Sequence, residues 1–208
     1  MAELEAEGKK VYTICGGGSD DLGALGYGLA AMEIIEQSEQ LKREHGIEGS
    51  GNFFDAIVTC SGSGGTHTGL VAGLRAAGDM VPVIGISVRF DAETQAGRIR
   101  EQYSAAVKRN FADFEYFSDG APPEDIVVRS DWVGPGYSLP TDEMAEAVEL
   151  FARKESILLD PVYTGKGAAG LIGLARSGDF PEGARLLFIH TGGAPSLFHY
   201  ETLYHDDA

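Results

Sequence analysis

The sequence predicts an α/β fold with a mostly parallel sheet and helices on both of its faces. Short apolar runs of strand length alternate with stretches of helical periodicity along most of the 208 residues. Three glycine clusters also follow predicted strands directly, after Cys15, after Cys60 and after His190. Because parallel sheets bind ligands beyond the carboxyl ends of their strands, these clusters predict a ligand site at that edge.

The predicted strands are short apolar runs bounded by turn residues. They are, in order, Val11–Cys15, Phe54–Cys60, Val81–Val88, Asp125–Arg129 and Arg185–His190. The first ends in three glycines and is expected to be buried. The third is apolar almost throughout, which is typical of a strand that is buried on both faces.

The predicted helices carry apolar residues at helical spacing or capping residues at their start. They are Leu22–His45, Thr66–Ala77, Glu93–Arg109, the segment after Thr141, Gly167–Arg176 and a short helix at Ser196–Tyr204. Loops are expected at Phe111–Glu124, Gly134–Pro140 and Asp160–Lys166. Thr141 is suited to cap its helix, and the acidic first turn that follows interacts favourably with the helix dipole.

Composition and charge narrow the possible functions. The hydrophobic fraction of 43% and the charged fraction of 23% are ordinary for a globular protein. The net charge of −16 disfavours nucleic acid and anionic membranes as partners, and the sequence contains no apolar run long enough for a membrane span. Met1–Lys10 lacks the apolar stretch of a signal peptide, and Cys15 and Cys60 stand in no metal-ligand spacing. We therefore expect a cytoplasmic protein without a metal site.

A glycine-rich loop between a predicted strand and a predicted helix has the physical parts of a phosphate site. Glycines let backbone N–H groups approach a ligand closely, and the helix N-terminus adds partial positive charge. The candidate cofactor-binding residues in this loop are Gly62, Ser63, Gly64, Gly65 and Thr66. No Lys-Ser or Lys-Thr pair follows them, which excludes a Walker loop, and their spacing departs from the dinucleotide fingerprint. A tight strand-to-helix turn without any ligand is the alternative.

Five segments, in this order, are similar to one enzyme family. They are Gly17–Ser19 with Leu22–Tyr27, Ser61–His67, Val133–Tyr137, Leu159–Lys166 and His190–Pro195. Together they resemble the D-cysteine desulfhydrases and 1-aminocyclopropane-1-carboxylate deaminases over nearly the whole chain. The resemblance implies the tryptophan-synthase-β architecture, known as fold type II, with pyridoxal 5'-phosphate as cofactor. It also implies a small amino acid as substrate and a homodimer in the complete enzyme.

The resemblance assigns roles to individual residues. Gly62–Thr66 are expected to hold the cofactor phosphate, and Thr191 is expected to lie near the pyridine nitrogen. Tyr137 and Tyr163 match tyrosines of the family's active site and are the predicted catalytic residues. Aromatic core packing with a hydrogen-bonded hydroxyl is the alternative for both. Their position in Gly/Pro loops favours the active site.

Two threonines indicate the substrate. Thr164 is assigned to the substrate pocket, and the deaminases that open the cyclopropane ring carry Glu and Leu at the places of Thr164 and Thr191. The predicted reaction therefore converts D-cysteine to pyruvate, hydrogen sulfide and ammonia. The alternatives are a 1-aminocyclopropane-1-carboxylate deaminase, a non-catalytic phosphate- or cofactor-binding module, and a nicotinamide dehydrogenase of Rossmann type.

The catalytic lysine of the family has no counterpart in this sequence. In the family it lies upstream, in an Asn-Lys segment, as does a Ser-Asn segment that contacts the substrate carboxylate. Residues 1–208 are thus expected to be an incomplete cofactor-binding large domain, with the small domain and the Schiff-base segment upstream. Lys42 and Lys154 are expected on solvated helix faces and Lys166 at a helix start, and none is predicted to substitute. His67, His190 and the two cysteines are expected to be structural.

Overall fold

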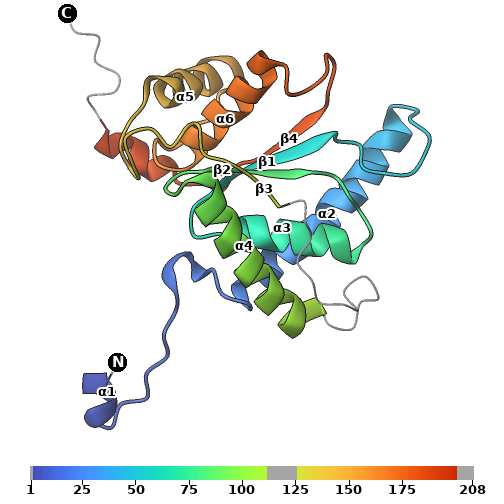
Figure 1. Ribbon diagram of the computed structural model, residues 1–208. Coiled ribbons are helices and arrows are strands. Elements are labelled where there is room, and N and C mark those ends of the chain that lie inside the picture. Colours follow the sequence, from blue (N-terminus) through green and yellow to red (C-terminus); the bar gives the residue numbers. More distant parts are fainter. Residues whose placement is uncertain (1, 112–125, 201–208) are drawn as a thin grey trace, which may run out of the picture.

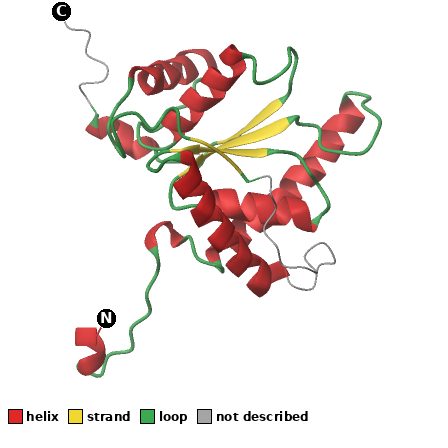
Figure 2. Cartoon of the chain, in the orientation of Figure 1, coloured by secondary structure: helices red, strands yellow, loops and turns green. Residues whose placement is uncertain are grey.

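A parallel four-stranded sheet lies between two layers of helices (Figure 1, Figure 2). The structure, a computed structural model, describes residues 2–111 and 126–200. The strands are β1 (Ala56–Ser61), β2 (Val83–Ser87), β3 (Val127–Arg129) and β4 (Leu186–Ile189), in the spatial order β3-β2-β1-β4. All three pairings are parallel, so the predicted fold class is confirmed.

Helices cover both faces of the sheet, as predicted. In Figure 1, α5 and α6 lie above the sheet and α3 and α4 lie below it, with α2 packed against α3. The helical elements are α1 (Ala2–Ala6), η1 (Gly16–Gly18), α2 (Gly23–Glu44), α3 (Gly65–Ala76), α4 (Ala92–Ala106), η2 (Val107–Phe111), α5 (Asp142–Glu155), α6 (Thr164–Ser177) and η4 (Ala194–His199). Among the described residues, no helix has the length and apolar character of a membrane span. The loop predicted at Phe111–Glu124 lies almost entirely outside the described residues.

The central strand β1 fixes the register of the sheet. All six of its residues are buried, and Ile57 pairs with Val83 of β2 on one side and with Leu187 of β4 on the other. Because parallel strands share one direction, the residues that follow β1 and β2 emerge at the same edge of the sheet. That edge carries the glycine loop at Gly62 and the turn at Arg89.

The predicted strand Val11–Cys15 is wrong. This segment pairs with no strand in the described part of the chain and runs away from the body of the molecule as an extended arm (Figure 1). Tyr12 is 78% exposed and Ile14 is 75% exposed. An apolar run becomes a strand only where a neighbouring strand can complete its hydrogen bonds. Neither edge strand of the sheet, β3 or β4, pairs with this segment.

Helix α6 begins three residues before its predicted start because of Asp160. The Asp160 carboxylate accepts hydrogen bonds from the N–H groups of Val162 at 2.9 Å, Tyr163 at 2.8 Å and Thr164 at 2.8 Å. The carboxylate thus holds the turn that leads into the helix and satisfies the N–H group of its first residue. Thr164–Lys166 therefore belong to the helix rather than to the predicted loop.

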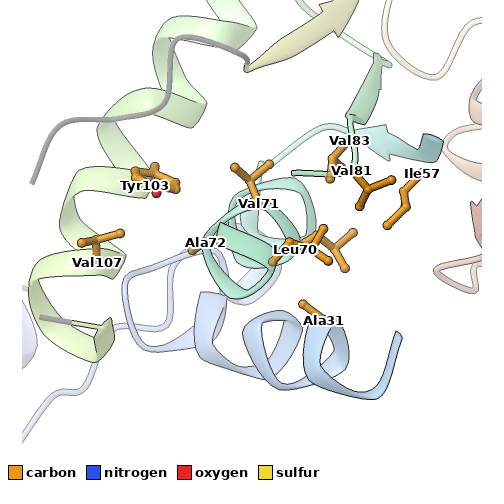
Figure 3. Packing of buried hydrophobic residues seen from close by; sticks show 10 residues of the cluster. Ala31, Ile57, Leu70, Val71, Ala72, Val81, Val83, Tyr103 and Val107 are labelled. Atoms are coloured by element: carbon orange, nitrogen blue, oxygen red, sulfur yellow. The ribbon is translucent and has the colours of Figure 1, made fainter. Parts of the chain in front are cut away.

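One hydrophobic core fills the space between α2, α3, α4 and the sheet (Figure 3). Its fully buried members include Ala31, Leu70 and Tyr103. Gly69 and Gly73 of α3 allow α2 and α3 to pack closely here. A Cβ on Gly69 would lie 2.3 Å from the Ala24 carbonyl oxygen. Part of the high glycine content therefore serves helix packing and not a ligand.

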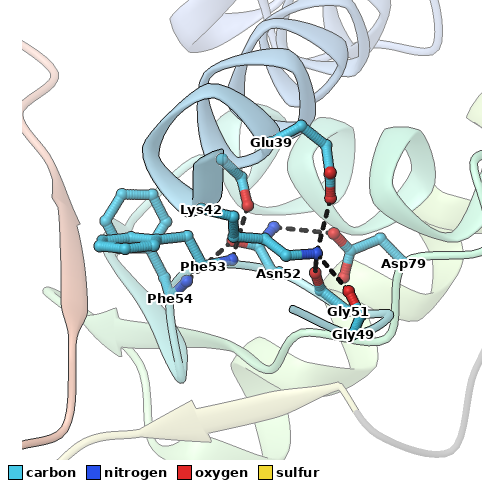
Figure 4. A network of polar contacts seen from close by, with 9 residues as sticks. Glu39, Lys42, Gly49, Gly51, Asn52, Phe53, Phe54 and Asp79 are labelled. Carbon is cyan, nitrogen blue, oxygen red and sulfur yellow. Dashed lines mark hydrogen bonds and ion pairs between the residues drawn. The ribbon is translucent and has the colours of Figure 1, made fainter. Parts of the chain in front are cut away.

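Lys42 is buried, and its prediction as a residue of a solvated helix face is wrong (Figure 4). Its Nζ donates to the carbonyls of Gly49 at 2.7 Å and Gly51 at 2.9 Å, and it pairs with Glu39 at 2.8 Å. The lysine thus joins the end of α2 to the loop that precedes β1. Lys154, at the end of α5, is exposed as expected.

Candidate active site

A cavity of about 450 Å³ lies where the chain leaves β1 and β2. This volume is within the range of about 300–1,000 Å³ that is common for small-molecule sites. Four of the predicted site residues line it together, namely Gly62, Ser63, Tyr137 and Tyr163. Residues up to 101 positions apart in the sequence thus meet at the predicted edge of the sheet.

The remaining predicted residues do not line the cavity. Gly64 and Gly65 are buried in the same loop, and Thr66 is half-buried in the first turn of α3. The Thr191 hydroxyl lies 3.2 Å from the Cys60 sulfur, just beyond β4. Thr164 is fully buried, and its hydroxyl donates to the Asp160 carboxylate at 2.7 Å and accepts from the Asp160 N–H at 2.8 Å. The roles of both threonines therefore stay predictions.

Two glutamines of α4 hold the glycine loop by its carbonyl groups. Gln95 Nε2 donates to the Gly62 carbonyl at 3.1 Å, and Gln102 Nε2 donates to the Ser63 carbonyl at 2.8 Å. In a trans peptide the N–H group points opposite to the C=O group. The N–H groups of Ser63 and Gly64 therefore point away from α4 in a common direction.

The amide groups of this loop are largely free to bind a ligand. Gly65 N–H donates to Ser19 Oγ at 3.1 Å, and Ser19 Oγ donates in turn to Ser63 Oγ at 2.7 Å. Among the described residues, no group accepts a hydrogen bond from the N–H groups of Ser63, Gly64 or Thr66. Gly64 caps α3 in a left-handed conformation with φ of 103°, and α3 directs its positive end toward these groups. Unpaired donors at a helix N-terminus fit a phosphate group.

The two predicted catalytic tyrosines touch each other at the cavity. Their hydroxyl groups share a hydrogen bond, and their ring centroids lie 5.9 Å apart in an edge-to-face arrangement. Tyr137 is 42% exposed and Tyr163 is 38% exposed, which excludes core packing. The hydrogen bond to Tyr137, together with burial, raises the pKa of Tyr163 to about 12. Tyr163 therefore keeps its proton through the neutral range.

Tyr137→Phe is expected to lower the pKa of Tyr163 from about 12 toward its ordinary value, since the largest cause of the shift is removed. The value can be followed by NMR titration of ¹³Cζ-labelled tyrosine. Tyr12→Phe is a suitable control because Tyr12 lies far out in solvent, 78% exposed. An unchanged Tyr163 titration in Tyr137→Phe would contradict the coupling of the two hydroxyls.

Lys166 is buried and supports the loop that carries Tyr137. Its Nζ donates to the carbonyls of Val133 at 2.7 Å and Gly136 at 2.8 Å, and burial lowers the pKa of its ammonium group. Lys166 stands in the first turn of α6, as predicted for a helix start, and its side chain is fully buried. Among the described residues, the cavity lining contains no lysine.

The histidines have structural positions, as predicted. His190 accepts from the Gly192 N–H at 3.0 Å through Nδ1, and its Nε2 lies 3.1 Å from the Leu158 carbonyl. His67 is fully buried, and burial lowers its pKa to about 4, so it is neutral near pH 7. The described residues contain no cluster of three His, Cys, Asp or Glu side chains that could hold a metal ion.

The cysteines differ from one another. Burial raises the pKa of Cys60 to about 11, so its thiol is neutral and unreactive, in agreement with the structural interpretation. Cys15 is only half-buried and lines the cavity, which the expectation of a structural role did not foresee. Cys15 lies here because the loop through Ser19 folds back onto the glycine loop.

Sequence reasoning missed several residues of the cavity wall. They are Ser19, Arg89, Phe90, Arg98 and Gln102. A signal existed for Arg89 and Phe90, because they come directly after the third predicted strand and so reach the ligand edge of the sheet. Arg98 and Gln102 stand one turn apart on α4, and no local pattern marks them.

Comparison with known proteins gives the family. The sequence model described as "Pyridoxal-phosphate dependent enzyme" matches residues 1–192. A solved structure described as an ACC deaminase homologue is 34% identical, with a TM-score of 0.78. The match covers 97% of this chain and 55% of that chain, so this chain spans about half the length of that relative.

A second solved structure is more distant. It is a fungal L-serine ammonia-lyase from Rhizomucor miehei, 20% identical over 88% of this chain and 56% of that chain, with a TM-score of 0.49. The first match confirms the resemblance to the deaminase and desulfhydrase group, and pyridoxal phosphate is the cofactor of the matching family. The chain belongs to the family of pyridoxal-phosphate dependent enzymes.

Proposed function

We propose that residues 1–208 form the cofactor-binding large domain of a lyase that converts D-cysteine to pyruvate, hydrogen sulfide and ammonia. The observation that carries this proposal is the joint placement of the glycine loop, through Gly62 and Ser63, and a hydrogen-bonded tyrosine pair at one cavity. Thr164 and Thr191 support D-cysteine, because neither place offers a carboxylate to the cofactor ring. We further propose a homodimer in the complete enzyme and a cytoplasmic location, which suits two free cysteines.

The loop amides of Ser63, Gly64 and Thr66 would hold the phosphate of the cofactor. When bound, pyridoxal phosphate supplies the electron sink for a carbanion at the substrate α-carbon. Ser19 holds the glycine loop in place through its hydrogen bonds with Ser63 and Gly65. The glutamines of α4 keep the loop in this orientation from the opposite side.

Tyr163 contributes a protonated hydroxyl at the cavity. With a pKa of about 12, it donates a hydrogen bond or a proton at neutral pH and is almost never available as a base. Its Oη can therefore donate a hydrogen bond to the departing sulfur, while Tyr137 orients it through the shared hydrogen bond. Lys166 fixes this orientation by holding the loop on which Tyr137 stands.

A 1-aminocyclopropane-1-carboxylate deaminase is the second candidate. It is favoured by the match to an ACC deaminase homologue at 34% identity. A non-catalytic cofactor-binding module is the third, since this chain spans about half of that relative. Borohydride reduction after addition of pyridoxal phosphate separates the module from the enzymes, because only a protein with a reacting lysine is labelled covalently.

Substrate preference is tested on the native protein, purified with every segment or subunit that accompanies it in the cell. We expect D-cysteine to yield pyruvate and sulfide in the presence of pyridoxal phosphate, and 1-aminocyclopropane-1-carboxylate to yield no 2-oxobutanoate. L-cysteine serves as the stereochemical control. Turnover of the cyclopropane substrate without turnover of D-cysteine would replace the first candidate by the second.

A further inference from the structure

Asp160 is a buried carboxylate in the turn that leads from Leu159 into α6. The residue is 1% exposed. Its two carboxylate oxygens accept hydrogen bonds from the N–H groups of Val162, Tyr163 and Thr164 and a fourth from the Thr164 hydroxyl at 2.7 Å. A protonated carboxyl group would need an acceptor for its own proton, whereas all four groups here are donors. Their arrangement is therefore that of an ionised carboxylate.

The charge of Asp160 is buried without a cation. Among the described residues, the ion pairs of lysine and arginine all involve other carboxylates. A comparable pair stands at the start of α4, where Asp91 accepts from the N–H and the hydroxyl of Thr94 at 2.8 and 2.7 Å, but Asp91 is exposed. Holding a helix start thus requires no burial. Burial does strengthen the effect of a charge on its neighbours, because water screens the charge less.

Two segments that carry predicted site residues meet at Asp160. The first is the turn of Tyr163, whose N–H group lies 2.8 Å from the carboxylate. The second is the loop after β4, which carries Thr191. In this loop, a Cβ on Gly193 would lie 2.8 Å from the Cγ and the Oδ1 of Asp160, so the backbone of the loop packs directly on the carboxylate. Asp160 therefore joins the tyrosine turn to the threonine loop.

We propose that Asp160 is a positioning residue of the active site, whose buried charge and hydrogen bonds hold Tyr163 in place and oppose a negative charge on its hydroxyl. The hydrogen bond to Tyr137 and burial are the largest causes of the raised pKa of Tyr163, and the charge of Asp160 acts in the same direction. Thr164 acts through Asp160, because its hydroxyl both donates to the carboxylate and accepts from the Asp160 N–H. Only the action of the Tyr163 hydroxyl on a departing sulfur rests on the proposed function.

The test compares the titration of Tyr163 in two variants by NMR of ¹³Cζ-labelled tyrosine. Asp160→Asn keeps the shape of the side chain and removes its charge, so we expect the pKa of Tyr163 to fall, though less than in Tyr137→Phe, which removes the largest cause. Thr164→Val leaves the charge and its three N–H donors, so Tyr163 should keep its pKa of about 12. Asp91→Asn is the matched control, since it alters the comparable, exposed pair on α4.

The outcomes separate a positioning charge from a structural turn. An unchanged titration of Tyr163 in Asp160→Asn, or an equal fall of its pKa in Thr164→Val or Asp91→Asn, would overturn the proposal. Should Asp160→Asn fail to fold, the ¹³Cγ signal of Asp160 in the unaltered protein decides. An ionised carboxylate at neutral pH supports the proposal, and a protonated carboxyl group overturns it. These measurements need neither cofactor nor turnover, so failure of the lyase assay leaves their result intact.

Discussion

Gly64→Ala is expected to weaken the binding of pyridoxal phosphate about a hundredfold. Gly64 has φ of 103°, and an added Cβ would lie 2.4 Å from Gln102 Oε1 and 2.9 Å from Ile99 Cδ1. To avoid this clash, either the loop must change its conformation or Gln102 must move, and both changes displace the amides of Ser63 and Gly64. Two lost hydrogen bonds to a charged group cost about 3 kcal/mol or more, which corresponds to about two powers of ten in affinity.

Gly97→Ala is the matched control for this loss. Gly97 lies in α4, and an added Cβ would meet no atom within 4 Å. We expect unchanged cofactor affinity and a stability increased by about 0.5–1 kcal/mol, since alanine is the better helix former. Fluorescence titration with pyridoxal phosphate measures both variants. Equal affinity of Gly64→Ala and Gly97→Ala would contradict the role of the loop.

Lys166→Met is expected to lower the free energy of unfolding by about 3 kcal/mol. The substitution keeps the length of the side chain but leaves the carbonyls of Val133 and Gly136 without their donor inside the molecule. Each buried polar group without a partner costs about 1–3 kcal/mol, and relief from burying the ammonium offsets part of this cost. Urea unfolding followed by circular dichroism measures the change.

A second measurement distinguishes release of the loop held by Lys166 from a general loss of stability. The loop between Val133 and Gly136 leads into Tyr137, so its release is expected to lower the pKa of Tyr163 in the folded variant. Lys154→Met is the control, because Lys154 is exposed and its change is expected to stay within about 0.5 kcal/mol. If Lys166→Met were as stable as Lys154→Met, the lysine would not hold the loop.

The helices α2 to α6 and the four strands of the sheet were predictable because local pattern and final packing agree. The arm at Val11–Cys15 was not, since its apolar residues look like a strand whether or not a partner strand exists. The start of α6 also escaped prediction, because Asp160, which holds the turn before the helix, precedes a proline and reads as part of a loop. Lys42 was misplaced because a long side chain can turn inward to carbonyl groups of the following loop, and the burial of Lys166 has the same cause.

The site was predictable where it is formed by glycine- and proline-rich loops. Gly62–Thr66 and the tyrosine loops stand out by their glycines and prolines at the ends of predicted elements. Arg98 and Gln102 could not be found in this way, because their place at the cavity depends on how α4 packs against β1 and β2. The same limit applies to Ser19, whose contact with Gly65 spans 46 positions.

The central claim is that the amides at the start of α3 bind the phosphate of pyridoxal phosphate. An amide-resolved ¹H–¹⁵N NMR titration tests it most directly, with pyridoxal, which lacks the phosphate, as the comparison. We predict large downfield shifts of the Ser63, Gly64 and Thr66 amides with pyridoxal phosphate and small ones with pyridoxal. Saturating pyridoxal phosphate that leaves these three amides unshifted, while signals elsewhere move, would contradict the claim.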